Sequence, residues 1–392
     1  MPHKSGRSSL RNLFISFIIL SSLNSLARIS PLDNLRSGHT IKVRVAKDLD
    51  NVMLEGVDLT RKVVATRNRK SFKGFKKIKV NCQNLQSAKS VKPQYLASLT
   101  SQTGLISFDR KQFMGQMHIV TSADGNSCDV VNEMDLDDYI ATLLAKEMNA
   151  SWPIEALKAQ AVAARTYALH HMMISGLKND TLYDLENSEK HQVNGTFNDV
   201  TASTLEAAKD TAGLVLTNGE GNLVPAFFHA SCGGTTLIPS DVWRNDVHGY
   251  STVKCDYCQK KKNWDSKITK LRFKKFLNWA MKKNYIEQQS LKKKLFLYPD
   301  KRDEKNLYVQ NGVKKIKIKK SLFRRYFGRV EFPSNHFYMV DVGGAGLHFV
   351  GKGNGHGVGL CQVGSLGLAQ KGKGHREILA HYFPKLNILK LY

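Results

Sequence analysis

The clearest hydrophobic pattern of the chain lies at residues 135–147 and predicts an amphipathic helix. Asp135 can cap its start, and the apolar side chains that follow have the spacing of one buried helix face. They are Leu136, Tyr139, Ile140, Leu143 and Leu144. Glu147 comes four residues after Leu143, so its carboxyl group should lie on this apolar face. Apolar surroundings make ionisation costly, and we therefore expect a raised pKa and a carboxyl group that keeps a proton to donate.

A second helix is predicted directly afterwards, because Pro153 ends the first helix and suits the first turn of another. Lys158 and Arg165 are seven positions apart, which is two helical turns, so they share one face. The small residue Ala161 lies between them and would let other backbone approach. One interpretation is a cleft in which the two cations face Glu147. The alternative is that the cations form a solvated face and the acid is an ordinary residue at a helix end.

Residues 40–120 alternate polar and apolar side chains with the two-residue period of β-strands. The clearest runs are 41–45, 52–57 and 116–120. A third helix is expected after residue 200, and the short apolar run 223–228 is expected to be a strand that ends at His229. These patterns predict an α+β fold, in which helices pack on β-sheets and the N-terminal region is rich in strands.

Residues 254–330 form a lysine-rich segment that differs from the rest of the chain in charge. They hold 25 Lys and Arg against 6 Asp and Glu, and so carry 19 of the 26 net positive charges. An amphipathic helix is expected around residues 271–280, and a half-buried strand where Ile316 and Ile318 alternate with lysines. We interpret the segment as a basic insert. It is either a solubilising face or a clamp on an anionic polymer, whose binding would weaken with salt.

The N-terminus has the parts of a secretory signal over residues 1–27. Basic side chains come first, an apolar run follows at residues 13–20, and Ser25-Leu26-Ala27 offers a small-x-small cleavage site. The apolar run is short for a bilayer span, so membrane contact is expected only if the signal stays uncleaved as an anchor. We therefore predict an exported protein of the periplasm or cell envelope. Export argues against nucleic acid as the partner of its positive charge.

Six cysteines are present, and three of them are candidates for a metal site. Cys255 and Cys258 form a C-x-x-C pair that could complete a zinc site with Cys232 and His229, because thiolate and imidazole groups suit zinc. In an exported protein, a disulfide is the competing use of the same cysteines. The spacing leaves both options open.

Residues 146–169 resemble the stage II sporulation protein D family, also called SpoIID/LytB. They carry its Glu-Met pair, its Trp-Pro pair and then Glu-Ala-Leu-Lys-Ala-Gln-Ala-Val-Ala-Ala-Arg-Thr-Tyr-Ala, nearly letter for letter. Further blocks similar to those of the family follow at residues 187–195, 229–235 and 355–364. The resemblance implies a SpoIID-like catalytic core at residues 125–253 and 331–392, interrupted by the basic insert and preceded by a β-rich region at residues 40–124.

The resemblance also implies a function, that of a lytic transglycosylase cutting peptidoglycan glycan strands that lack stem peptides. Glu147 matches the family's catalytic acid, and Lys158 and Arg165 match basic residues that the family needs in the same cleft. Substrate contacts are expected at five further positions, with structural hydrogen bonding as the alternative role: Gln192, His229, Ser231, His356 and Gln362. Such strands expose a lactyl carboxylate on every muramic acid unit, so a polyanionic partner agrees with the net charge. No cofactor is required, and a structural zinc ion remains an option.

Three positions differ from the family pattern without removing the acid. Asn149 stands where a proline is usual, Asn194 where a tyrosine is usual, and Cys361 where a serine is usual. Some family members also hold zinc just before the Gln-Val block. The stretch 183–192 offers only His191 among cysteines and histidines, so that zinc site is not expected in this chain.

Two other functions remain open. A muramidase that uses water would need a second acid near Glu147, and Glu155, Asp199 and Asp241 are the candidates. A non-catalytic wall-binding protein could instead stimulate an amidase, which would then be its protein partner. A transglycosylase uses the sugar's own 6-hydroxyl as nucleophile and needs only one acid, so a second carboxyl group beside Glu147 would favour the muramidase.

Overall fold

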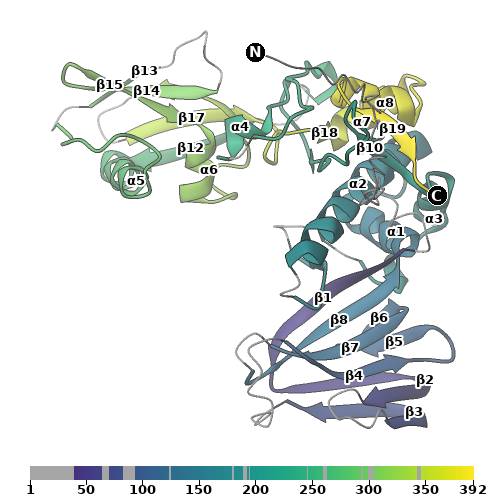
Figure 1. Cartoon of the computed structure of the whole chain (residues 1–392). Helices are drawn as coiled ribbons and strands as arrows, with labels where there is room; N and C mark the ends of the chain where they lie inside the picture. Colours follow the sequence, from purple (N-terminus) through teal and green to yellow (C-terminus); the bar gives the residue numbers. More distant parts are fainter. Residues whose placement is uncertain are drawn as a thin grey trace, which may run out of the picture.

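The computed structural model describes residues 39–392, apart from short segments. The segments left out are 64–69, 83–92, 123–124, 179–180, 189–191, 194, 245, 259–262, 293–294, 299–302, 304 and 342–345. The signal predicted at residues 1–27 therefore lies outside the described residues. Within the described part, helices and strands combine in an α+β fold, which confirms the predicted class (Figure 1). None of the helices described is both long enough and apolar enough to cross a bilayer.

A large, mostly antiparallel sheet forms the N-terminal part of the chain. Its strand order is β6-β5-β2-β4-β7-β8-β1-β9, and β3 pairs with β2 beside this path. The strands are β1 (Thr40–Leu49), β2 (Asn51–Val63), β3 (Lys70–Asn81), β4 (Tyr95–Thr100), β5 (Leu105–Phe108), β6 (Lys111–Met114), β7 (Gln116–Thr121), β8 (Cys128–Asp135) and β9 (Leu185–Glu186). The three runs predicted from alternation fall within β1, β2 and β7. A disulfide between Cys82 and Cys128 ties the end of β3 to the start of β8.

The sheet leads directly into the helix that carries Glu147. Asp135, the last residue of β8, accepts hydrogen bonds from the backbone N–H groups of Asp137 and Asp138. This N-cap starts α1 (Leu136–Glu147), and the apolar face predicted for the helix is buried. The sheet therefore fixes the start of α1, and α1 ends at Glu147.

The central part of the molecule is helical, and several helices pack on the long helix α2. The helices are α1, α2 (Ile154–Lys178), α3 (Ala202–Asp210), α4 (Pro239–Val242), α7 (Gln362–Gln370) and α8 (His375–Tyr382). Two short strand pairs lie among them: β10 (Leu214–Thr217) with β19 (Asn387–Lys390), and β11 (Phe228–His229) with β18 (Leu360–Cys361). The strand predicted at 223–228 is reduced to β11, because Pro225 has no backbone N–H and its carbonyl accepts from the hydroxyl of Tyr250 instead.

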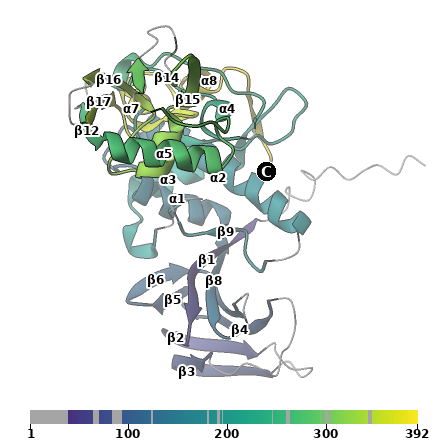
Figure 2. The same cartoon turned by 90° about the vertical axis from the view of Figure 1, so that its left-hand side faces the viewer.

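The lysine-rich segment folds into a lobe with a hydrophobic core of its own, on one side of the helical part: at the left in Figure 1 and toward the viewer in Figure 2. The elements of this basic lobe are β12 (Trp264–Thr269), α5 (Lys270–Lys282), β13 (Phe296–Tyr298), β14 (Asn306–Asn311), β15 (Lys314–Lys319), α6 (Ser321–Phe327), β16 (His336–Asp341) and β17 (Gly346–Lys352). The predicted helix and half-buried strand correspond to α5 and β15. Because β16 and β17 form a sheet with β12, the lobe continues beyond residue 330, where the insert was expected to end.

Candidate active site

A pocket of about 1140 Å³ lies where the helical part meets the basic lobe. Its walls come from distant stretches of chain, namely the end of α1, the middle of α2, β11, α6 and the glycine-rich segment before β18. Five of the predicted site residues line it: Glu147, Gln192, His229, His356 and Gln362. Three others do not, and these are Lys158, Arg165 and Ser231.

Glu147 presents a partly buried carboxyl group to this pocket. Burial raises the pKa of the carboxyl group above its ordinary value. Two groups act in the opposite direction, because the backbone N–H of Val193, 3.3 Å from Oε1, and the side-chain amide of Gln362 favour the ionised form. The pKa remains raised, as expected from the apolar face of α1, and a carboxyl group of this kind suits a general acid.

Two histidines in the pocket are held uncharged. Nδ1 of His229 lies 3.1 Å from the carbonyl oxygen of Val358, and burial lowers the pKa of the ring to about 4. Nδ1 of His356 accepts a hydrogen bond from the backbone N–H of Val358 at 3.0 Å, and burial lowers its pKa well below the usual range. Nε2 of His229 has no hydrogen-bond partner among the described residues. At neutral pH this part of the pocket is therefore polar but uncharged.

Alternating glycines bring the segment of His356 against the strand of His229. Gly355 has a φ of 109°, and a Cβ atom built there would lie 2.7 Å from Cβ of His229. The ring centroids of the two histidines are 5.5 Å apart. Glycines alternate along residues 351–359, and their small size allows the close backbone approach that brings the two rings together.

Gln192 lines the pocket, but both ends of its amide are occupied within the protein. Its Oε1 accepts from the hydroxyl of Tyr139 at 2.8 Å, and its Nε2 donates to the carbonyl oxygen of Ala164 at 3.2 Å. The next residue, Val193, is the one that donates to Glu147. These contacts agree with the structural alternative, in which Gln192 positions the backbone donor rather than holding a sugar.

Ser231 was expected to contact substrate, and the structure places it elsewhere. Its side chain is buried and lines a small separate pocket with Thr236 and Ser334. Its backbone pairs with Asn354 in both directions, at 2.9 and 2.7 Å. Through its backbone, Ser231 fixes the glycine-rich segment beside β11, and a contact between its side chain and substrate stays a prediction.

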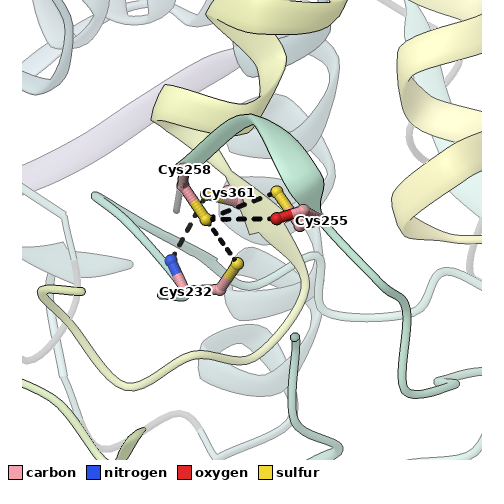
Figure 3. Close-up of side chains that lie close together, drawn as sticks. All are labelled: Cys232, Cys255, Cys258 and Cys361. Carbon is pink, nitrogen blue, oxygen red and sulfur yellow. Dashed lines mark hydrogen bonds between the residues drawn. The ribbon is translucent and has the colours of Figure 1, made fainter. Parts of the chain in front are cut away.

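Four buried cysteines lie close together near β11, β18 and the start of α7 (Figure 3). They are Cys232, Cys255, Cys258 and Cys361. His229 is not part of this group, because its Nδ1 is bonded to Val358 and its ring lines the pocket. Cys361, which caps the N-terminus of α7, therefore lies beside the other three cysteines in the place that the zinc option gave to His229.

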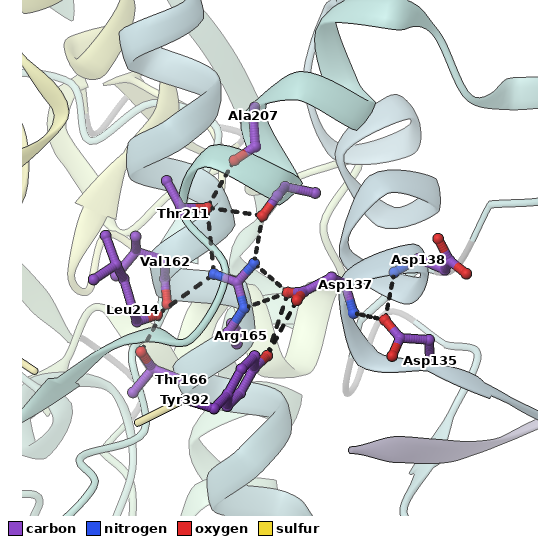
Figure 4. Close-up of polar contacts among 11 residues, drawn as sticks. Asp135, Asp137, Asp138, Val162, Arg165, Thr166, Ala207, Thr211, Leu214 and Tyr392 are labelled. Carbon is purple, nitrogen blue, oxygen red and sulfur yellow. Dashed lines mark hydrogen bonds and ion pairs between the residues drawn. The ribbon is translucent and has the colours of Figure 1, made fainter. Parts of the chain in front are cut away.

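Arg165 and Lys158 do share one face of α2, but that face packs on α3 rather than on the pocket. Arg165 is fully buried and donates to Asp137 at 2.6 and 2.9 Å and to the carbonyl oxygen of Ala208 at 3.0 Å (Figure 4). Lys158 forms an ion pair with Asp210 at 2.8 Å. The expectation of two cations beside Glu147 is corrected: both residues join helices to each other.

The cations that do line the pocket come from the basic lobe, and they are missing from the sequence-based site. They are Arg324, Arg325 and Arg329, on or just after α6. Nε of Arg324 donates to the carbonyl oxygen of Pro333 at 3.2 Å, which holds its guanidinium group beside the pocket. The one signal for these residues in the sequence is a local change from lysine to arginine near the end of the insert.

The acids proposed as partners of Glu147 are all engaged elsewhere. Glu155 contacts Lys158 and His375, Asp199 contacts Lys146, and Asp241 contacts Lys305. Within the described lining of the pocket, Glu147 is the only residue with a carboxyl group.

The sequence of this chain is similar to those of several known proteins. The family model described as stage II sporulation protein (SpoIID) matches residues 124–218, which include Glu147. An uncharacterized protein of Brachyspira hyodysenteriae is 33% identical over 263 residues, which cover 66% of this chain and 68% of that protein.

Two relatives have functional names. The amidase enhancer of Bacillus subtilis is 25% identical over 358 residues, which cover 78% of this chain but 48% of that protein. Stage II sporulation protein D of Bacillus amyloliquefaciens is 26% identical over 270 residues, which cover 66% of this chain and 75% of that protein. This chain thus spans about half the length of the amidase enhancer and most of the sporulation protein.

Proposed function

This chain belongs to the stage II sporulation protein D (SpoIID) family, and from that premise we propose that it is an exported lytic transglycosylase acting on the cell wall. It cuts the bond between N-acetylmuramic acid and N-acetylglucosamine in glycan strands without stem peptides and leaves 1,6-anhydro ends. The observation that carries the proposal is the environment of Glu147, a carboxyl group of raised pKa with no second acid in the described lining of its pocket.

Glu147 acts first as an acid and then as a base. In its protonated form it donates its proton to the glycosidic oxygen while the bond from that oxygen to C1 of muramic acid breaks. The carboxylate then accepts the proton of the 6-hydroxyl of the same muramic acid, whose oxygen bonds to C1 and closes the anhydro ring. Glu147 ends protonated again, and no water is consumed.

The surroundings of Glu147 fit both halves of this cycle. Burial favours the protonated form that begins the reaction, whereas the Val193 N–H and the Gln362 amide stabilise the carboxylate formed midway. The uncharged histidines His229 and His356 add no positive charge that would pull the pKa of Glu147 down.

The arginines of the basic lobe account for the preference for stripped strands. Removing stem peptides leaves a lactyl carboxylate on each muramic acid, and Arg324, Arg325 and Arg329 face the same pocket as Glu147. Guanidinium groups bind carboxylates through paired N–H donors. The insert thereby takes the anion-binding role that the family resemblance assigned to Lys158 and Arg165.

The second candidate function, stimulation of an amidase, is favoured by the name of the relative from Bacillus subtilis. In that function the pocket would bind glycan without cutting it, and Glu147 would not need to change protonation state. A muramidase is disfavoured, because water-dependent cleavage requires a second acid near the first.

The deciding experiment is a digest of glycan strands, with and without stem peptides, by the full chain. Chromatography and mass spectrometry of the products should find 1,6-anhydro-muramic acid ends on the stripped strands. Reducing ends alone would make the protein a hydrolase. No cleavage of either substrate, together with acceleration of an added amidase, would favour the enhancer function.

A further inference from the structure

The four-cysteine cluster has the geometry of a metal site rather than of two disulfides. The Sγ atoms of Cys232, Cys255, Cys258 and Cys361 all lie within 4.8 Å of one another. Cys258 is 3.1 Å from the sulfur of Cys232 and 3.5 Å from that of Cys255, whereas a disulfide requires about 2.05 Å. A zinc ion bound at about 2.3 Å to four sulfurs would hold them about 3.8 Å apart.

The cluster is closed to solvent. The four cysteines are between 0 and 3% exposed, and they come from three separate stretches of chain. Zinc sites with four protein ligands and no open position are structural, whereas catalytic zinc keeps one position for water or substrate. The burial therefore indicates a structural site.

Polar hydrogens point at the sulfur atoms, as expected around thiolates. The backbone N–H groups of Cys232 and Gly364 donate to Sγ of Cys361 at 3.4 and 3.3 Å, and the hydroxyl of Tyr382 lies 3.2 Å from Sγ of Cys255. Four thiolates around one divalent cation carry net negative charge, and such donors offset it. Gly364 is also required by space, because a Cβ atom there would lie 1.9 Å from the hydroxyl oxygen of Tyr382 and 2.6 Å from Sγ of Cys255.

The cluster lies at the base of the basic lobe and behind one wall of the pocket. Cys255 and Cys258 directly precede the lobe, and Cys361 follows the segment by which the chain returns from it. Cys232 lies three residues after His229, and Cys361 is adjacent to Gln362, so both neighbours line the pocket. A metal ion here would join the two ends of the lobe to the strands that carry pocket residues.

We propose that Cys232, Cys255, Cys258 and Cys361 bind one structural Zn²⁺ ion that clamps the basic lobe onto the helical part. The site differs from the zinc site of some family members, which lies before the Gln-Val block. The proposal is independent of the catalytic activity, because the ion has no open position for substrate. Zinc binding releases the thiol protons and couples to the stability of the folded chain.

The test uses the full chain, purified without reductant and without added metal. Elemental analysis should find one zinc ion per chain, and replacement by Co²⁺ should give the intense visible absorption of tetrahedral thiolate coordination. Alkylation in denaturant and chelator should then modify these four cysteines and leave Cys82 and Cys128 as a disulfide. Zinc-free protein in which any of the four is joined in a disulfide would overturn the proposal.

Two pairs of variants separate the site from general effects on folding. Cys361→Ser should abolish stoichiometric zinc, whereas the double change Cys82→Ser and Cys128→Ser should keep it. Gly364→Ala should speed zinc loss to a chelator, whereas Gly176→Ala, where a Cβ atom meets open space, should not. Full zinc content in folded Cys361→Ser protein would contradict the assignment. If that variant does not fold, the alkylation pattern of the unmodified chain decides.

Discussion

The backbone N–H of Val193 donates to Oε1 of Glu147 across 3.3 Å, and this contact joins two parts of the chain that are 46 residues apart. Glu147 ends α1, while Val193 follows Gln192, whose amide is held by Tyr139 and Ala164. The acid is therefore oriented by a backbone donor. Substituting the side chain of Val193 would not remove this donor. Burial and the side chain of Gln362 are the other two influences on its pKa.

Replacing Glu147 by glutamine should remove catalysis while preserving the fold. Glutamine keeps the size of the side chain but cannot donate the proton, so the cleavage rate should fall by roughly 10²–10⁴-fold. The rate is measured as anhydro ends released from stripped glycan. Glu155→Gln is the matched control, because Glu155 lies outside the pocket and pairs with His375. Equal activity of Glu147→Gln and the unmodified protein would exclude Glu147 as the acid.

Removing the amide of Gln362 should move the pH profile in a defined direction. Gln362 favours the ionised form of Glu147, so Gln362→Leu should raise the pKa of that carboxyl group further. Because the protonated acid is the active form, the alkaline limb of kcat/KM should shift to higher pH. Gln370→Leu changes an exposed glutamine in the same helix and should leave the limb unmoved. A shift to lower pH would contradict the assigned interaction.

The raised pKa of Glu147 also predicts how stability changes with pH. The folded state binds this proton more tightly than the unfolded state, so the contribution of Glu147 to stability falls as pH rises from its unfolded value toward its raised folded value. Below both values the contribution is absent. Glu147→Gln should therefore increase the Tm at neutral pH relative to the unmodified protein, and this gain should disappear in acid. Differential scanning calorimetry at several pH values measures the difference.

Arg165 and Lys158 should differ sharply when each is changed to methionine. Arg165→Met removes a fully buried guanidinium group that donates to Asp137 and to the carbonyl oxygen of Ala208. Tyr392 and Thr211 still contact these two acceptors, so the change should cost about 1–3 kcal/mol of unfolding free energy. Lys158→Met breaks a pair with the half-exposed Asp210 and should cost about 0.2–1 kcal/mol. Urea unfolding measures both values. A large rise in KM for Lys158→Met, with stability intact, would restore the expectation that Lys158 binds substrate.

The arginines on and just after α6 should contribute salt-dependent affinity. Arg325→Ala and Arg329→Ala should each weaken binding of stripped glycan by roughly two- to five-fold at low salt, as for exposed charge pairs. The effect should shrink above physiological ionic strength, where the screening length is about 8 Å or less. Arg376→Ala also removes one positive charge, at an exposed position of α8 outside the pocket, and serves as the control. Equal losses for all three variants would indicate an effect of net charge alone.

Local patterns predicted the elements that carry the acid. The spacing of apolar residues and the cap at Asp135 define α1, and they place Glu147 on its apolar side with a raised pKa. These features depend on residues within a few turns or one strand of each other, so the chain's local order is sufficient to reveal them.

Contacts between distant segments decided the rest. The sequence by itself determined that Lys158 and Arg165 share one face of a helix, but the tertiary structure decided that this face packs on α3. Only the fold brings Cys361 to the cysteines near residue 255, and only the fold puts the arginines on and just after α6 in the lining of the pocket that holds Glu147. Periodicity shows which side chains share one face of a helix. Which element packs on that face depends on how distant segments of the chain fold back against it, and no local pattern encodes this.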